Sequence, residues 1–160
     1  MTTHHGDPGH DGDLGVELTV AREAADEAAA IVRASYLRPT RRRRKGAHDV
    51  VTAIDVRAER AIMHRLRSAF PCDARIGEES GASGGRTDGA HGRSWLVDPL
   101  DGTVNFAAGV PFFSVSIALV ERGRALIGIV VDPLTEERFV GVTGSGAWHE
   151  PSLAALAARR

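Results

Sequence analysis

Two carboxylates three residues apart occur in a stretch whose residue types can bind both a metal ion and a phosphate. Residues 95–106 are WLVDPLDGTVNF, with Asp98 and Asp101 near the middle. The apolar start is typical of a buried strand. We expect it to end in a sharp turn at Asp98, because Pro99 fixes its own φ and disfavours a helical conformation for the preceding residue. Carboxylate oxygens, together with the Leu100 carbonyl oxygen between them, suit a hard cation such as Mg²⁺.

The end of the same stretch favours phosphate binding. Gly102 permits an unusual backbone dihedral, and Thr103 can cap or open a short helix through Phe106. The free N–H groups at a helix start suit an anion. A simpler interpretation is also open at this point: the stretch is only a capped strand-to-helix connection, and its Asp residues serve as turn formers.

The full string D-P-L-D-G-T-x-N-F resembles the central motif of the inositol monophosphatase family, a family of Mg²⁺-dependent sugar-phosphate phosphatases. Two further segments agree with this resemblance. Residues 45–55 resemble the family's K-x-x-x-D-x-V-T-x-x-D segment, and residues 74–80 resemble its G-E-E segment. Gly144 begins a turn similar to the family's G-x-G-A segment. Three motifs in the family's order make the resemblance specific over about residues 45–148.

The resemblance implies roles for particular residues. The implied Mg²⁺ ligands are Glu78, Asp98, the Leu100 carbonyl oxygen and Asp101. Glu78 and Thr103, the latter oriented by Asp55, are expected to position the attacking water, with Glu79 in a supporting role. The implied substrate contacts are Glu78, Leu100, Asp101, Gly102 and Thr103.

The implied activity is Mg²⁺-dependent hydrolysis of a phosphate monoester, most specifically of inositol 1-phosphate to inositol and phosphate. Fructose 1,6-bisphosphate and histidinol phosphate are other substrates within the family. The family pattern continues with a W-D-x-A-A-G segment, whose Asp is a further metal ligand, and this sequence does not contain it. We therefore expect impaired activity and at most one Mg²⁺ of useful affinity per chain. The alternative is a non-catalytic fragment that acts as a binding or interaction protein.

Two helices are expected to position these residues. Apolar residues at three- and four-residue steps predict a first helix from Leu14, which ends at or before Arg38 because Pro39 follows. A second helix should run from Asp55, as its N-cap, to about Ala69. Its expected buried face consists of Val56, Ile62, Leu66 and Phe70.

The remaining elements are expected to be strands and loops. Residues 74–80 should form a short strand that runs into a loop, and the glycine-rich residues 80–94 a flexible loop. Alternating apolar residues predict an antiparallel meander of three strands over 113–119, 125–131 and 138–142. Residues 144–148 should follow as a turn.

These elements predict an α+β fold with two helices packed on one face of a mainly antiparallel sheet. This arrangement resembles the N-terminal half of the inositol monophosphatase fold, here over residues 14–150. Residues 1–13 are expected to be a disordered tail and residues 151–160 a second tail, with the C-terminal half of the family fold absent. An apolar sheet face is then left open, so a homo-oligomer is one expected state.

Composition excludes several classes of protein. The chain has 160 residues, 42% of them hydrophobic and 26% charged, which is typical of one globular domain. A net charge of −1 gives no support for nucleic-acid or membrane binding. We interpret the basic run at 41–45 as a solvated helix exit, because no aromatic residues interleave it. The single Cys72 excludes an internal disulfide. We expect a cytoplasmic protein. Its expected partner is a small-molecule phosphate monoester.

Overall fold

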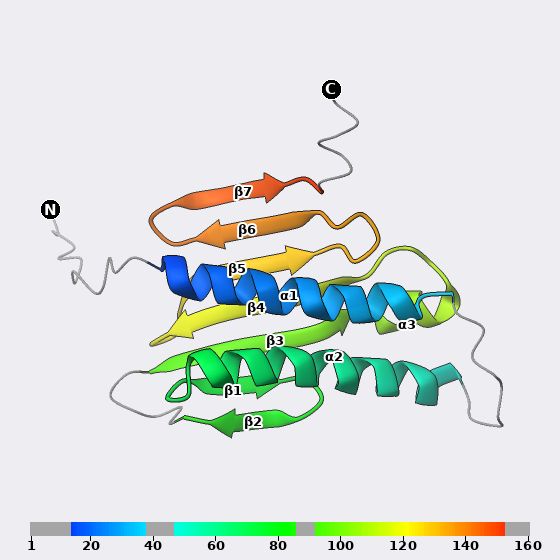
Figure 1. Cartoon of the computed structure of the whole chain (residues 1–160), viewed down its shortest axis with the longest axis horizontal. Helices are drawn as coiled ribbons and strands as arrows, with labels where there is room; N and C mark the ends of the chain where they lie inside the picture. The colour runs from blue at the N-terminus through cyan, green and yellow to red at the C-terminus, as the bar shows by residue number, and fades with distance from the viewer. Residues whose placement is uncertain (1–13, 38–46, 86–91, 153–160) are drawn as a thin grey trace, which may run out of the picture.

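Two long helices cover one face of a seven-stranded sheet (Figure 1). The computed structural model describes residues 14–37, 47–85 and 92–152. The helices on the sheet are α1 (Gly15–Ser35) and α2 (Ala47–Ala69). The predicted α+β architecture is therefore confirmed. The basic run at 41–45, the tail predicted at 1–13 and residues 153–160 of the tail predicted at 151–160 lie outside the described residues.

The sheet is mainly antiparallel, with strand order β2-β1-β3-β4-β5-β6-β7. The strands are β1 (Ala74–Gly77), β2 (Gly81–Gly84), β3 (Arg93–Asp101), β4 (Ser114–Glu121), β5 (Arg124–Val131), β6 (Arg138–Val142) and β7 (Gly146–Glu150). A short helix, α3 (Thr103–Ala108), follows β3. Only β1 and β3 pair in parallel among these strands. Their carboxyl ends therefore lie at the same end of the sheet, which is where the candidate site is found.

The meander of β4, β5 and β6 is confirmed, but two strands differ from the sequence prediction. Residues 81–84, predicted as loop, form β2 and pair with β1. Residues 146–150, predicted in part as a turn, form β7 and pair with β6. The turn between β6 and β7 contains Gly144 and Gly146, whose φ values are +84° and +91°. Both strands are short edge strands that are rich in glycine and alanine, so they lack the alternating apolar pattern that would indicate a strand.

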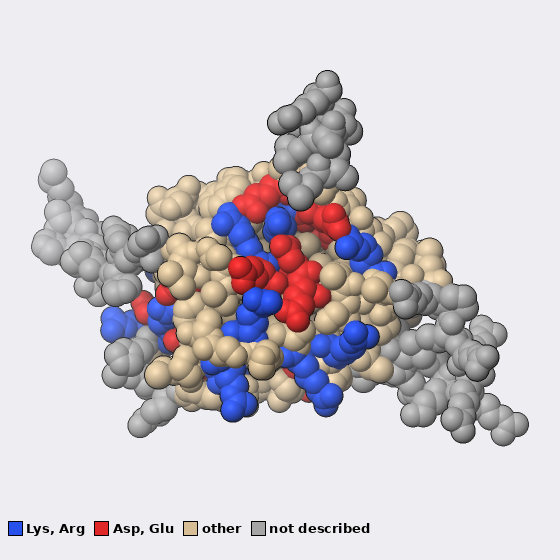
Figure 2. All heavy atoms as spheres, viewed as in Figure 1, with Lys and Arg blue, Asp and Glu red and all other residues tan. Residues whose placement is uncertain are grey.

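The first helix follows its prediction. Its buried residues are mostly small: Ala21, Ala24, Ala25, Ala28, Ala29 and Val32. Small side chains allow the helix axis to approach the sheet and α2 closely, because little volume has to fit between them. Ion pairs from Arg65 of α2 to Glu23 and Glu27 of α1, at 2.8 and 3.0 Å, join the outer sides of the two helices. Figure 2 shows acidic and basic side chains intermixed over this solvent face.

The second helix begins earlier than predicted. It starts at Ala47, so Asp55 lies inside the helix and the prediction that Asp55 is its N-cap is wrong. No glycine or proline follows Gly46 to interrupt the helix before Asp55. The buried stripe also differs from the predicted face, because it includes polar residues. Its buried members are Asp55, Ala58, Glu59, Ile62 and Leu66.

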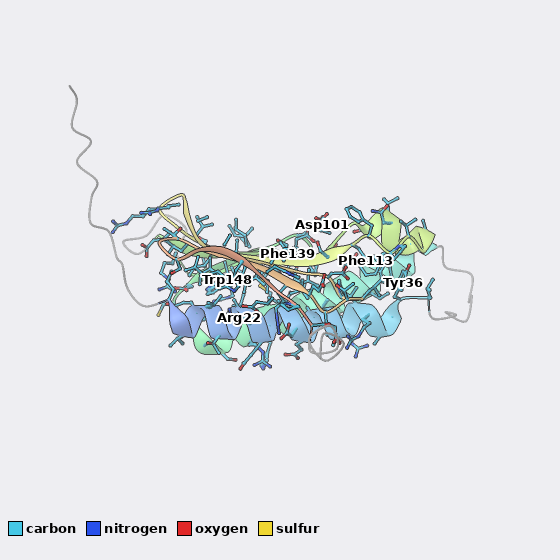
Figure 3. The ribbon with its side chains drawn as sticks, turned by 90° about the horizontal axis from the view of Figure 1, so that it is seen from above. Arg22, Tyr36, Asp101, Phe113, Phe139 and Trp148 are labelled. Atoms are coloured by element: carbon cyan, nitrogen blue, oxygen red, sulfur yellow. The ribbon has the colours of Figure 1, made fainter. Side chains whose placement is uncertain are left out.

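The core between helices and sheet is centred on Trp95 of β3. Trp95 is fully buried, its ring stacks on Phe70 with centroids 5.4 Å apart, and its indole N–H donates to the Asp73 carboxylate at 3.0 Å. The opposite face of the sheet carries no helix in the described residues, and seen from above the structure is two layers (Figure 3). None of the helices described is long and apolar enough to cross a membrane.

Candidate active site

Parallel pairing of β1 with β3 brings two acidic residues together. Gly77 is opposite Val97 in the register, so the next residues, Glu78 and Asp98, extend side by side from the same end of the strands. The Glu78 N–H donates to the Val97 carbonyl at 3.2 Å. The carboxyl groups of Glu78 and Asp98 are hydrogen-bonded to each other. Two charged carboxylates this close repel each other, which favours a cation between them.

The strand that carries Asp98 does not end there, so the predicted strand end and turn at Asp98 are wrong. The ladder of β3 with β4 is irregular after Asp98 and resumes at Asp101, opposite Ser114. Pro99 has no N–H to give to the ladder, which accounts for the interruption without ending the strand. The Asp98 carboxylate accepts the Leu100 N–H at 3.1 Å and fixes this irregular segment.

The sharp turn comes at Gly102. Its φ is +92°, and a Cβ there would lie 2.8 Å from the Phe112 carbonyl oxygen. Both conformation and space therefore require glycine at this position. Thr103 begins α3 as predicted, but its hydroxyl donates to the Leu100 carbonyl oxygen at 3.0 Å rather than to Asp55, which was expected to orient it. The turn thus joins one predicted metal ligand directly to the predicted water-positioning hydroxyl.

Aromatic packing holds α3 against the end of α1. Phe106 is buried and its ring centroid lies 5.6 Å from that of Tyr36 and 5.1 Å from that of Phe113. The Tyr36 hydroxyl donates to the Gly109 carbonyl at 2.7 Å, and the Asn105 amide donates to the Phe112 carbonyl at 2.8 Å. Figure 3 shows Tyr36 and Phe113 together beside α3. The segment that is predicted to bind phosphate, Gly102 and the start of α3, is therefore held in place by the packing of α3.

Asp55 faces the acidic pair from α2. It is 4% exposed, and its Oδ1 atom has no hydrogen-bond partner among the described residues. Burial, followed by the charges of Glu79, Glu78 and Asp98, raises the pKa of Asp55 to about 7. Burial and the Glu78 carboxyl likewise raise the pKa of Asp98 to about 6. The cluster therefore holds more negative charge than its surroundings neutralise.

The structure gathers some of the predicted metal ligands and not others. Among the described residues, no three carboxylate, imidazole or thiol side chains are close enough to hold a metal ion by themselves. Glu78 and Asp98 are in contact, while Asp101 is exposed on the side of the sheet away from the helices (Figure 3). Asp55 also has a buried carboxylate oxygen without a hydrogen-bond partner. None of the ion pairs among the described residues joins Asp55, Glu78 or Asp98 to a basic residue. This arrangement fits a single hard cation.

One residue of the site was missed by sequence reasoning. Glu59, four residues after Asp55 on the same face of α2, is 3% exposed and accepts hydrogen bonds from the chain just after Glu78. Its spacing could have identified it: Glu59 lies three and seven residues before Ile62 and Leu66, so its side chain is on the buried face of α2. A buried glutamate needs partners, and this one finds them in the backbone of the site.

We expect the stability of the metal-free protein to fall as pH rises. The raised pKa values of Asp55 and Asp98 mean that the folded state binds protons more tightly than the unfolded state, in which both pKa values are about 3.8. Their favourable contribution is complete below pH ~4 and is lost as pH rises through about 6 and 7. Mg²⁺ should therefore raise the melting temperature more at pH 7.5 than at pH 5, which differential scanning fluorimetry can measure. An equal or larger Mg²⁺ effect at pH 5 would contradict this.

Comparison with known proteins agrees with the geometry. The sequence profile of the group described as "Inositol monophosphatase family" matches residues 13–157. Inositol monophosphatase 3 of Solanum lycopersicum is 40% identical over 131 residues, 82% of this chain and 49% of the relative. Nus factor SuhB of Pasteurella multocida is 41% identical over 132 residues, 81% of this chain and 48% of the relative.

A solved structure extends the comparison to three dimensions. An inositol monophosphatase from Zymomonas mobilis, whose structure concerns a flexible region at the active site, superimposes with a TM-score of 0.72 at 33% identity. The match covers 88% of this chain and 53% of that one. The chain thus spans about half the length of the curated relatives that it matches.

Proposed function

Because the chain belongs to the inositol monophosphatase family, we propose that it hydrolyses phosphate monoesters with the help of one Mg²⁺ ion. Membership of this family supports a phosphatase function in general. The single observation that carries the proposal for this chain is the contact between Glu78 and Asp98 at the ends of two parallel strands, with buried Asp55 facing both.

The chain's own residues divide the work of the proposed reaction. Glu78, Asp98 and the Leu100 carbonyl oxygen would hold the cation, whereas Asp101, exposed away from the helices, is not assigned to it. A bound Mg²⁺ supplies charge stabilisation of the phosphoryl oxygens and a lowered pKa for a bound water. Glu78 accepts a proton from the attacking water. Backbone N–H groups at the start of α3 steady the phosphate.

Thr103 and Asp55 are proposed to act together on the water. The Thr103 hydroxyl donates to the Leu100 carbonyl oxygen in the described structure, so its own oxygen remains available to accept a hydrogen bond from water. Thr103 would accept one O–H of the water, which leaves the other O–H for Glu78, the group that takes the proton. Asp55 would act through the charge near its unpaired Oδ1 rather than as a further acceptor.

We propose inositol 1-phosphate as the first substrate to test. Several relatives are named inositol monophosphatase, whereas others are named Nus factor SuhB and CysQ, so the family includes proteins with different names and the substrate needs a direct test. The test measures phosphate released from inositol 1-phosphate, fructose 1,6-bisphosphate and histidinol phosphate with Mg²⁺ or with a chelator. We expect slow release that requires Mg²⁺. Release that is unaffected by the chelator, or no release from any monoester, would contradict the proposal.

A second candidate function is pairing with another copy of this chain through the open sheet face. Four large apolar side chains are exposed there: Ile76 at 36%, Leu96 at 40%, Val130 at 38% and Phe139 at 52%. Val130 and Phe139 line a shallow groove there together with small residues, including Gly128 and Gly141. A flat face of this kind favours self-association, because two copies can bury it against each other.

Self-association should therefore depend on this face. We expect the wild type to be dimeric or larger at micromolar concentration, and the double variant Leu96→Ser with Phe139→Ser to shift toward monomer, as measured by light scattering. Val16→Ser is the matched control, because Val16 is 67% exposed on α1, away from this face. A wild type that is monomeric and binds no dye for exposed apolar surface would eliminate this candidate.

A further inference from the structure

We propose that Glu59 is a positioning residue that holds Glu78 beside Asp98, and that Gly77 is a glycine in order to give Glu59 room. This inference rests on the proposed function and deepens it, because it assigns a role to a buried residue that binds neither substrate nor metal. It starts from three neighbouring segments: the middle of α2, the end of β1 and the turn that follows β1.

The Glu59 carboxylate is satisfied entirely by backbone. One oxygen, Oε2, accepts the Glu79 N–H at 2.8 Å, and the other, Oε1, accepts the Ser80 N–H at 2.9 Å. None of the ion pairs among the described residues involves Glu59. A buried carboxylate without a basic partner is unfavourable unless several donors face it, and hydrogen bonds to a charged acceptor are stronger than neutral ones.

These two hydrogen bonds fix the residue that precedes them. The Glu78 N–H is already bound to the Val97 carbonyl of β3 at 3.2 Å. The chain is therefore held to β3 at Glu78 and to α2 at Glu79 and Ser80. Because the backbone is held at Glu78 and at the two residues after it, the Glu78 side chain starts from a fixed position. Its carboxyl group therefore stays in contact with Asp98.

Gly77 makes the contact possible through its lack of a side chain. A Cβ at this position would lie 2.5 Å from the carboxyl carbon of Glu59 and 2.7 Å from its Oε1 atom. Its φ is not in the left-handed region, so conformation does not require glycine here. The space requirement alone explains the glycine, and it predicts that any larger residue displaces the Glu59 carboxylate.

Two variants and one control test this role. Glu59→Gln preserves size but places an NH₂ group opposite a backbone N–H, so one of the two hydrogen bonds is lost. Gly77→Ala displaces Glu59 without changing any acidic residue. Glu27→Gln is the control, because Glu27 is a half-exposed partner of Arg65 on α1. Each protein is titrated with Mg²⁺ by calorimetry, and amide hydrogen exchange is measured at Glu79 and Ser80 without metal.

We expect Glu59→Gln and Gly77→Ala each to weaken Mg²⁺ binding by about tenfold, as removal of an outer partner of a metal ligand typically does. The amides of Glu79 and Ser80 should exchange about tenfold faster in both variants. Glu27→Gln should change neither quantity. In a Glu59→Ala background, Gly77→Ala should have little additional effect, since the space is then free.

The outcomes separate this inference from the proposed function. Unchanged Mg²⁺ affinity in Glu59→Gln, with accelerated exchange at Glu79 and Ser80, would overturn the positioning role and leave Glu59 a residue of structural stability alone. A wild type that bound no Mg²⁺ would contradict the proposed function. The exchange measurement needs no metal, and unchanged protection of Glu79 and Ser80 in both variants would overturn the positioning role of Glu59 independently of Mg²⁺ binding.

Discussion

Replacement of Asp98 with Asn should abolish Mg²⁺-dependent phosphate release while the protein stays folded. The amide oxygen of Asn can still accept the Leu100 N–H, which Asp98 accepts at 3.1 Å, so the irregular segment of β3 is preserved. The charge that binds the cation is lost. Loss of a metal ligand removes several kcal/mol of transition-state stabilisation, which corresponds to about 10³-fold in rate. Steady-state phosphate release at saturating substrate measures the effect.

The chain contains a closely matched control for this substitution. Asp132 also precedes a proline and a leucine, and its carboxylate accepts the Leu134 N–H at 2.7 Å, two residues on as at Asp98, and the Thr135 N–H at 3.1 Å. Asp132 lies in the turn between β5 and β6 rather than beside Glu78. Asp132→Asn should therefore leave the rate within about twofold of wild type. Equal rates for Asp98→Asn and wild type would show that the site has been assigned to the wrong carboxylate.

Replacement of Trp95 with Ala should cause the largest loss of stability of any single change in the core. The substitution removes a fully buried indole, its stacking on Phe70 and its hydrogen bond to Asp73. Truncation of a buried aromatic residue costs about 3–5 kcal/mol, which is comparable with the total stability of many small domains. Urea unfolding followed by far-UV circular dichroism is the measurement. We expect the variant to be largely unfolded at 37 °C.

The second tryptophan provides the control. Trp148 of β7 is only half-buried, and its indole N–H donates to Glu150 at 2.8 Å at the edge of the sheet. Figure 3 shows it beside Arg22, whose guanidinium carbon lies 5.9 Å from the indole ring centroid. Trp148→Ala should cost about 1–2 kcal/mol. A larger loss of unfolding free energy for Trp148→Ala than for Trp95→Ala would show that the core is not centred on Trp95.

Sequence reasoning identified the elements with strong periodic patterns. The alanine-rich stripe of α1 and the alternating β4, β5 and β6 were predicted within a few residues, because each buries one regular face. It also predicted that the stretch around Asp98 is the centre of chemistry, which stays a prediction. Its spacing placed Thr103 correctly at the start of α3, because Gly102 offers the turn that the helix needs.

The parts that were missed depend on pairing rather than on local pattern. β2 consists of Gly, Ala and Ser, and only its hydrogen bonds with β1 define it as a strand. β3 continues past Pro99 because β4 supplies a partner at Ser114, which no local rule predicts. Asp55 was predicted to be a helix cap, although the family resemblance also implied a role for it at the active site. Glu59 was overlooked, because its importance comes from the turn after β1 that packs on it.

The most direct test of the proposed site is a calorimetric titration of the chain with Mg²⁺ at pH 7.5, with Asp98→Asn and Asp132→Asn measured in parallel. The contact of Glu78 with Asp98, and the exposed position of Asp101, predict one Mg²⁺ per chain. That binding should be lost in Asp98→Asn and retained in Asp132→Asn. Two tight equivalent sites on the monomer, or Mg²⁺ binding that survives in Asp98→Asn, would contradict the account.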